Sequence, residues 1–180
     1  IIMKKFIPHI IALLIFVTIS AIYFSPVIGP GAKVLSAHDV DTWKGMSKEV
    51  CDHRDDTGEE ALWTKRMFSG MPAYQISTKS NGNLLQYIDK ALQLGLPRPM
   101  NLLFLYLLGF YILLLTLKID YRLSIVGAIG FAFSSYFLII IQAGHMTKAH
   151  SIAYIPLIVA SVLYVFNNKK LMLGAVFTSL

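Results

Sequence analysis

The sequence has a single cysteine, Cys51, and little charge, since only 14% of its 180 residues are charged while 56% are hydrophobic. One cysteine excludes an internal disulfide framework, and we interpret Cys51 as an ordinary small side chain. No nucleic-acid-binding motif is present. The net charge of +6 is therefore first explained by membrane topology and anionic lipid rather than by nucleic acid.

The few acidic residues are concentrated in one part of the chain. Nine of the ten, all but Asp120, lie between Lys33 and Arg98. Ile7–Ile28 and most of Asn101–Phe166 are apolar instead, and runs of about twenty apolar residues match the thickness of the bilayer hydrocarbon. This pattern predicts an all-α polytopic membrane protein with a large, partly helical first outer loop.

The predicted division of the chain follows from these runs. The first transmembrane helix falls within residues 1–29; it is too long for a signal peptide and lacks a small-x-small cleavage site. The outer loop spans residues 30–100. Residues 101–180 hold the second to fourth spans (Asn101–Leu117, Leu123–Gln142 and Ser151–Phe166) and the start of a fifth. We expect the chain to be the N-terminal piece of a longer protein.

Basic residues in the short connections predict the orientation. Three pairs fall on one side of a four-span arrangement: Lys4 and Lys5, Lys118 and Arg122, and Lys169 and Lys170. Because short cytoplasmic loops are enriched in Lys and Arg, we expect a cytoplasmic N-terminus in the bacterial inner membrane. The large loop and the connection 143–150 then lie together on the outer side.

Within the large loop, the pattern predicts short helices at Trp43–Arg54 and Thr57–Phe68. A third, interfacial helix is expected at about residues 84–95, because apolar residues recur there at helical spacing. Its polar face is expected to carry Gln86, Asp89, Lys90 and Gln93.

Two carboxylates, Asp39 and Asp41, follow the first span closely. Alternation would put both on one side if this stretch were extended. They have three possible roles: metal ligands, a general base, or solvated surface charges.

A second candidate is the outer connection with His145, Lys148 and His150. Lysine supplies charge and histidine a hydrogen-bond donor, so the three suit a phosphate group. The alternative is a polar interfacial connection without further role, although ionisable groups at a membrane are costly and more often functional. The aromatic stretch from Trp63 to Gln75 is either a groove for sugar or lipid or, as we favour, the small core of the loop.

The combined motifs resemble those of the YfhO family of bacterial membrane proteins, in its Bacteroidetes-type version. The resemblance rests on HDVDTWKGMSKE at 38–49, LWT at 62–64, MFSGMPAYQ at 67–75, and AGH and KAH within 143–150. It covers nearly the whole chain but only the N-terminal part of a full family member.

That family is similar to GT-C glycosyltransferases, which move a sugar from a polyprenyl-phosphate carrier to an acceptor. The resemblance implies a GT-C-like bundle, Asp39 as the general base with Asp41 in reserve, and His145, Lys148 and His150 at the carrier phosphate. Expected partners are the bilayer, a polyprenyl-phosphate-linked sugar and an envelope glycan or glycolipid acceptor. No cofactor is expected, and nothing supports a divalent metal.

Two rival functions remain open from the sequence. One is a transporter or flippase of lipid-linked precursors, although the predicted spans carry almost no charge. The other is a non-catalytic scaffold whose loop binds an envelope partner. Under the enzyme hypothesis we expect the 180-residue piece alone to be inactive, because the spans that complete the carrier groove are missing from it.

Overall fold

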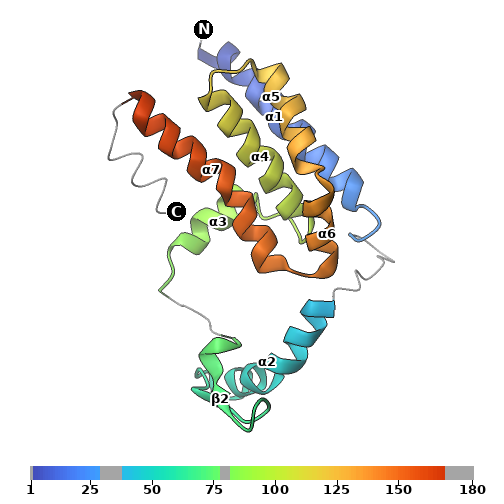
Figure 1. The fold of residues 1–180 in the computed structure, drawn as a ribbon, viewed down its shortest axis with the longest axis vertical. Helices are drawn as coiled ribbons and strands as arrows, with labels where there is room; N and C mark the ends of the chain where they lie inside the picture. Colours follow the sequence, from blue (N-terminus) through green and yellow to red (C-terminus); the bar gives the residue numbers. More distant parts are fainter. Residues whose placement is uncertain (1, 29–37, 78–81, 169–180) are drawn as a thin grey trace.

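The structure is a computed structural model that describes residues 2–28, 38–77 and 82–168. Most of these residues are helical, which confirms that the protein is predominantly α-helical. The elements, in chain order, are α1 (Ile2–Phe24), α2 (His38–Thr57), β1 (Trp63–Thr64), β2 (Met71–Pro72), the 3-10 helix η1 (Ala73–Gln75), α3 (Leu85–Leu92), α4 (Met100–Thr116), α5 (Tyr121–Ala132), α6 (Ser135–Ala143) and α7 (Met146–Asn168) (Figure 1).

Helices α1, α4, α5, α6 and α7 form a bundle in which α4 is central (Figure 1). Helix α4 contacts α1, α5 and α7, and every residue from Asn101 to Leu107 is buried. A helix that is apolar all round needs protein or lipid to cover every side. In α4 the cover comes from α1, α5 and α7, and its apolar sequence suits this central position.

Small and aromatic side chains set the spacing around α4. A Cβ atom at Gly109 would lie 3.1 Å from the carbonyl oxygen of Ala153, so glycine lets α4 and α7 approach closely. Aromatic rings pack α4 against α5 and α6. Phe110 stacks on Phe131 of α5 with ring centroids 4.4 Å apart, and Tyr106 stacks on Phe137 of α6 with centroids 4.8 Å apart. These contacts fix α4 against α5, α6 and α7.

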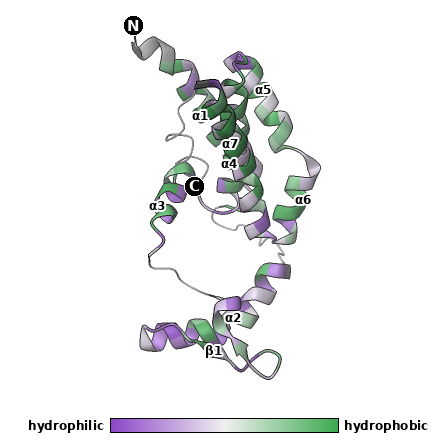
Figure 2. Ribbon diagram, turned by 60° about the vertical axis from the view of Figure 1, so that its left-hand side comes forward, coloured by the Kyte–Doolittle hydropathy of each residue, from purple (hydrophilic) through white to green (hydrophobic). Residues whose placement is uncertain are grey.

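Helices α1 and α7 are long and apolar enough to cross a membrane, over Phe6–Phe24 and Met146–Asn167. Only 17% and 28% of these two segments is buried within the protein. Large apolar side chains such as Leu14 and Ile22 are thus exposed, on a surface far more apolar than a soluble protein normally has. Figure 2 shows the predominantly hydrophobic sequence of the bundle helices. The chain is therefore a membrane protein.

The other predicted spans differ in detail from the expectation. Leu123–Gln142 was predicted as one span, but it forms α5 and α6, which meet at a bend of 48° and count as a third candidate span if taken together. The bend lies at Phe133 and Ser134, where Ser134 leaves the helical conformation with ψ of 129°. Helix α4 is apolar but has only 17 residues.

One polar contact lies between α1 and α4. Nδ1 of His9 lies 2.7 Å from the hydroxyl oxygen of Tyr111, and the ring of Phe16 meets Tyr111 edge-on. Hydrogen bonds between apolar helices compensate polar atoms that water does not reach. This contact ties α1 to the centre of the bundle.

Residues 38–77 form a polar unit beyond the end of the bundle, which Figure 2 shows as the hydrophilic part of the molecule. The predicted helix at Trp43–Arg54 is confirmed, since it lies inside α2. The predicted helix at Thr57–Phe68 is wrong. Gly58, with φ of 74°, follows the end of α2, and residues 63–64 pair with 71–72 as a small ribbon instead.

Polar contacts hold this ribbon against α2. The carboxylate of Glu49 accepts a hydrogen bond of 2.8 Å from the hydroxyl of Thr64, which is buried. The hydrogen bond from Thr64, aided by the backbone N–H of Lys65, outweighs the opposing effect of burial and places the pKa of Glu49 below its ordinary value. Arg54 and Glu60 form an ion pair at 2.6 Å across the end of the helix.

A helix does form in the region predicted to be interfacial, but its orientation differs from the expectation. Asp89 and Gln93 were placed on a polar outer face of α3; they point into the protein, and Gln93 is buried. Leu84 and Leu85 are exposed instead. The reason is that the neighbouring α7 offers polar partners to Asp89 and Gln93, which are one helical turn apart.

The two ends of the bundle carry different segments (Figure 1). One end holds the start of α1, the connection 117–120 and the end of α7. The other holds the connection between α6 and α7, with the 38–77 unit beyond it. The predicted basic pair Lys169 and Lys170 and the predicted fifth segment lie outside the described residues.

Candidate functional site

Asp39 and Asp41 lie in the first turn of α2, not in an extended segment. Residues two apart on a helix point about 200° apart around its axis. The two carboxylates accordingly diverge. Oδ1 of Asp41 lies 3.5 Å from Nζ of Lys44 on the exposed surface, whereas Asp39 points towards the connection between α6 and α7.

Gly144 brings His145 to Asp39. Helix α6 ends at Gly144, which has a φ of 88° in the left-handed region that glycine adopts without strain. The backbone N–H of His145 then donates to the carbonyl of Ile140 at 3.1 Å, a bond typical of helix ends of this kind. The chain turns here and starts α7 at Met146.

The two predicted residues Asp39 and His145 are in direct contact. Nδ1 of His145 lies 2.5 Å from Oδ2 of Asp39, and with an ionised carboxylate the imidazole is the donor. The side chains retain 45% and 51% of their exposure, so the pair is open to solvent. Residues far apart in the sequence thus form one acid–base pair.

This pair lines a cleft of about 620 Å³ between the 38–77 unit and the bundle. Lys148, predicted at the same site, and Arg98, which the sequence analysis did not single out, also line it. Nζ of Lys148 lies 5.4 Å from the centre of the Tyr136 ring, within the range of a cation–π contact. The full lining is Asp39, Val40, Trp43, Ile76, Ser77, Arg98, Gly144, His145, Met146, Thr147 and Lys148.

The charges in the cleft favour an anion. Two permanent cations and one histidine accompany a single carboxylate, and guanidinium and ammonium groups are the usual partners of phosphate. Among the described residues, no group of three or more His, Cys, Asp or Glu side chains gathers in a way that suits a metal ion. The cleft therefore offers a carboxylate base beside an anion-binding surface.

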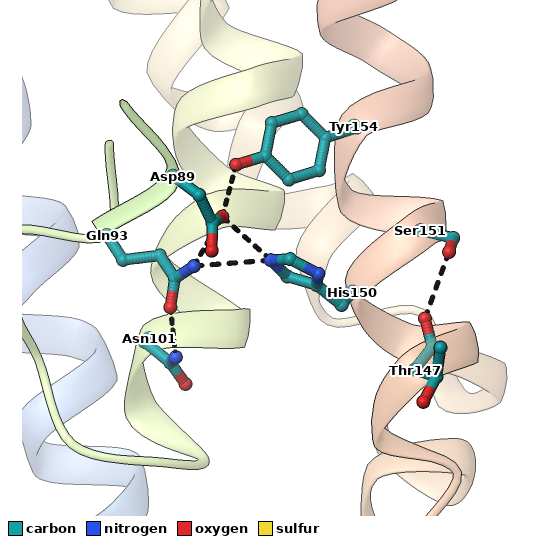
Figure 3. Close-up of polar contacts among 7 residues, drawn as sticks. All are labelled: Asp89, Gln93, Asn101, Thr147, His150, Ser151 and Tyr154. Atoms are coloured by element: carbon teal, nitrogen blue, oxygen red, sulfur yellow. Dashed lines mark hydrogen bonds and ion pairs between the residues drawn. The ribbon is translucent and has the colours of Figure 1, made fainter. Parts of the chain in front are cut away.

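His150, the third residue of the predicted phosphate group, does not line this cleft. It points to a half-buried polar network between α3, α4 and α7, shown in Figure 3. Nε2 of His150 lies 2.8 Å from Oδ1 of Asp89, and the Tyr154 hydroxyl donates to the same oxygen at 2.5 Å. Gln93 donates to it as well, at 2.5 Å, and accepts a hydrogen bond from the amide of Asn101.

The network shifts the titration of Asp89. Burial alone acts to raise the pKa of its carboxyl, but the hydrogen bonds from Tyr154, Gln93 and His150 outweigh burial, so the pKa lies below its ordinary value. Gln93 and Asn101 are both buried. Asp89 is therefore an ionised carboxylate whose hydrogen bonds come from side chains of α3 and α7.

The sequence analysis missed Asp89, Gln93 and Arg98 as parts of a site. A signal was present for the network, because Asp89 and Gln93 are four apart, as are His150 and Tyr154, and each pair shares one helix face. Nothing in the sequence showed that these two faces meet.

Compared with protein-family models, curated proteins and solved structures, the chain matches none.

Proposed function

We propose that the chain belongs to a multi-span membrane glycosyltransferase of GT-C type that moves a sugar from a polyprenyl-phosphate carrier to an envelope acceptor. The single observation that carries the proposal is the contact of Asp39 with His145 in a cleft that also holds Lys148 and Arg98. These are the groups that such a transfer needs: a base for the acceptor, and positive charge for a departing phosphate.

The proposed topology has four spans, formed by α1, α4, the α5–α6 pair and α7. In this arrangement the N-terminus is cytoplasmic, in the inner membrane of a bacterium. The cleft then opens at the outer face, where a lipid-linked sugar presents its head group. The arrangement of the bundle ends supports this topology, since the connection 117–120, which contains Lys118 and is followed by Arg122, lies at the end opposite to the cleft.

The proposed reaction is an inverting displacement at the anomeric carbon of the sugar. The acceptor hydroxyl oxygen forms a bond to that carbon while the bond from the carbon to the carrier phosphate breaks. The phosphate leaves with the electron pair, and the hydroxyl proton passes to Asp39. His145 orients Asp39 through Oδ2 and leaves Oδ1 for the acceptor, while Lys148 and Arg98 stabilise the leaving phosphate.

The test is the Asp39→Asn variant of the protein in its bacterial membrane, with sugar transfer to the envelope acceptor as the measurement. General base catalysis contributes about 10²- to 10⁴-fold, so we expect transfer to fall at least about a hundredfold with the carrier still bound. Asp41→Asn is the matched control, because Asp41 faces Lys44 on the surface and should leave transfer unchanged. An inserted Asp39→Asn protein that transfers sugar at the wild-type rate would refute the proposal.

Lys148→Ala separates binding from chemistry in the same assay. Removal of a cation from the phosphate surface should weaken carrier binding and lower transfer together. If carrier binding is unchanged, the anion-binding role of the cleft is wrong even where Asp39 is essential.

A further inference from the structure

Helix α3 is attached to the bundle in an unusual way. None of its eight residues is buried, although Leu92 and the following Leu96 pack on the core. Its carboxylate Asp89 receives hydrogen bonds from His150 and Tyr154 of α7 (Figure 3). A polar contact of this kind is specific, because it forms only in one arrangement of the helices.

The partners of this network adjoin the residues that line the cleft. His150 stands two positions after Lys148 in α7, and Asn101 three positions after Arg98 at the start of α4. The hydroxyl of Tyr106 also donates to the carbonyl of Ala149 at 2.9 Å, which holds the same turn of α7 against α4. Backbone hydrogen bonds make such a turn move as one body.

We propose that Asp89 is a positioning residue of the cleft. By holding His150 directly, and Asn101 through Gln93, it fixes the turn of α7 that carries Lys148 and the segment that carries Arg98. The proposal rests on the proposed function, since it concerns the groups that bind the carrier phosphate. It adds a residue that does not line the cleft and acts on the anion only through its neighbours.

The chemistry of the contact requires a carboxylate. Three donors converge on the single oxygen Oδ1 of Asp89, and a carboxylate offers acceptors only. An asparagine retains one acceptor oxygen but loses the charge, and hydrogen bonds to a charged acceptor are roughly twice as strong as those to a neutral one. Alanine leaves all three donors without this partner. The expected order of function is therefore Asp, then Asn, then Ala.

Trp43 provides a direct readout, because it lines the cleft and only two tryptophans are present in the chain. In a Trp63→Phe background, the fluorescence of Trp43 reports titration with inorganic pyrophosphate in reconstituted protein. Loss of the outer partner of a metal ligand typically costs about 10- to 100-fold in affinity. By the same positioning argument we expect Asp89→Ala to raise the dissociation constant for pyrophosphate about tenfold or more. Asp89→Asn should fall between Asp89→Ala and the wild type.

Two variants separate positioning from an unspecific effect. Asp56→Ala removes an equal charge from the exposed surface of α2 and should not change the affinity for pyrophosphate. In a His150→Ala background, Asp89→Ala should cost less than the tenfold it costs in the wild type, because only the route through Gln93 and Asn101 then remains. A full additional tenfold loss in that background would overturn the proposed route through His150.

Hydrogen exchange gives a second measurement that needs no ligand. Asp89→Ala should speed amide exchange at residues 149–152, the first hydrogen-bonded amides of α7, well below the unfolding temperature, and Asp89→Asn should restore part of the protection. If wild-type protein binds no pyrophosphate, the proposed phosphate site fails and exchange alone decides the positioning role. An Asp89→Ala protein with wild-type exchange in this turn, or with wild-type pyrophosphate affinity, would overturn the inference.

Discussion

The described part of the protein contains two carboxylate–histidine pairs with different surroundings, although their histidines stand only five residues apart, one just before α7 and one near its start. Asp39 and His145 are about half exposed and line an open cleft. Asp89 and His150 retain 31% of their exposure each, and Asp89 also accepts from Tyr154 and Gln93. The chemical groups are the same, but the number of partners and the access of solvent differ.

This difference predicts that one pair is reactive and the other structural. An exposed pair contributes little to stability, so its carboxylate can change partners at little cost when a substrate enters. A half-buried carboxylate with three donors holds its partners in place, because water replaces those hydrogen bonds poorly. We therefore expect the first pair to matter for chemistry and the second for the shape of the cleft.

The largest expected effect concerns the side of the membrane, because the proposed function requires both pairs to lie towards the outer face. In a Cys51→Ser background, single cysteines at Asp55 and Thr147 should react with an impermeant thiol reagent added outside intact cells. A cysteine at Asp120 should react only after the cells are opened. External labelling at Asp120, or none at Asp55, would place the cleft on the cytoplasmic side. Neither pair could then have the proposed role at the outer face.

Stability should distinguish the pairs next. We expect Asp89→Ala to lower the free energy of unfolding by about 2–4 kcal/mol, because it leaves several half-buried donors without a partner. Asp39→Ala should cost less than about 1 kcal/mol, as exposed pairs do. Unfolding titrations in mixed micelles measure both values. Equal losses in the two variants would show that the exposed pair is also structural.

A single hydroxyl tests the network more finely. Tyr154→Phe removes one donor to Asp89 and should cost about 1.5–3 kcal/mol, a value typical of hydrogen bonds to charged groups. The matched change near the cleft is Trp43→Phe, which removes a hydrogen bond of 3.0 Å to the carbonyl of Ile76. Trp43 is about half exposed, so this loss should stay below about 1 kcal/mol. The same unfolding titration compares the two.

The smallest effect is a pH dependence. The pKa of Asp89 is lowered in the folded protein, so the unfolded chain binds the proton first as the pH falls. Its contribution to stability is complete above the unfolded pKa of about 3.9 and is lost as the pH falls through the folded value. The stability advantage of the wild type over Asp89→Asn should therefore shrink below about pH 4. A constant difference from pH 7 to pH 3 would contradict the lowered pKa.

Apolar runs and helix patterns predict much of this fold from the sequence. The apolar stretches indicate the membrane helices, and the spacing from Trp43 to Arg54 indicates a helix there. The bend between α5 and α6 was missed because Phe133 and Ser134 stand in an otherwise continuous apolar run. The helix expected at Thr57–Phe68 failed because local propensity gave way to the contact of Glu49 with Thr64, which ties the ribbon to α2.

For the site, the sequence predicted only that its residues come from two connections on the same side of the helices. Topology placed Asp39 and His145 at one face, but their contact depends on the turn at Gly144 and on the packing of the 38–77 unit. His150 was grouped with Lys148 because they are neighbours in sequence. On a helix, residues two apart point about 200° from each other, so they serve different surroundings. The same geometry separates Asp39 from Asp41.

The hydrogen bond from Trp43 to Ile76 has a consequence for evolution. It joins the beginning of the 38–77 unit to its end, so the chain enters and leaves the unit at neighbouring points. Lengthening a loop costs little entropy once its ends are held together, about 0.6 kcal/mol for each doubling. The ribbon at the far side of the unit can therefore gain or lose residues while Asp39 stays in place. Related sequences can therefore differ in the length of the ribbon while the acid–base pair of Asp39 and His145 is unchanged.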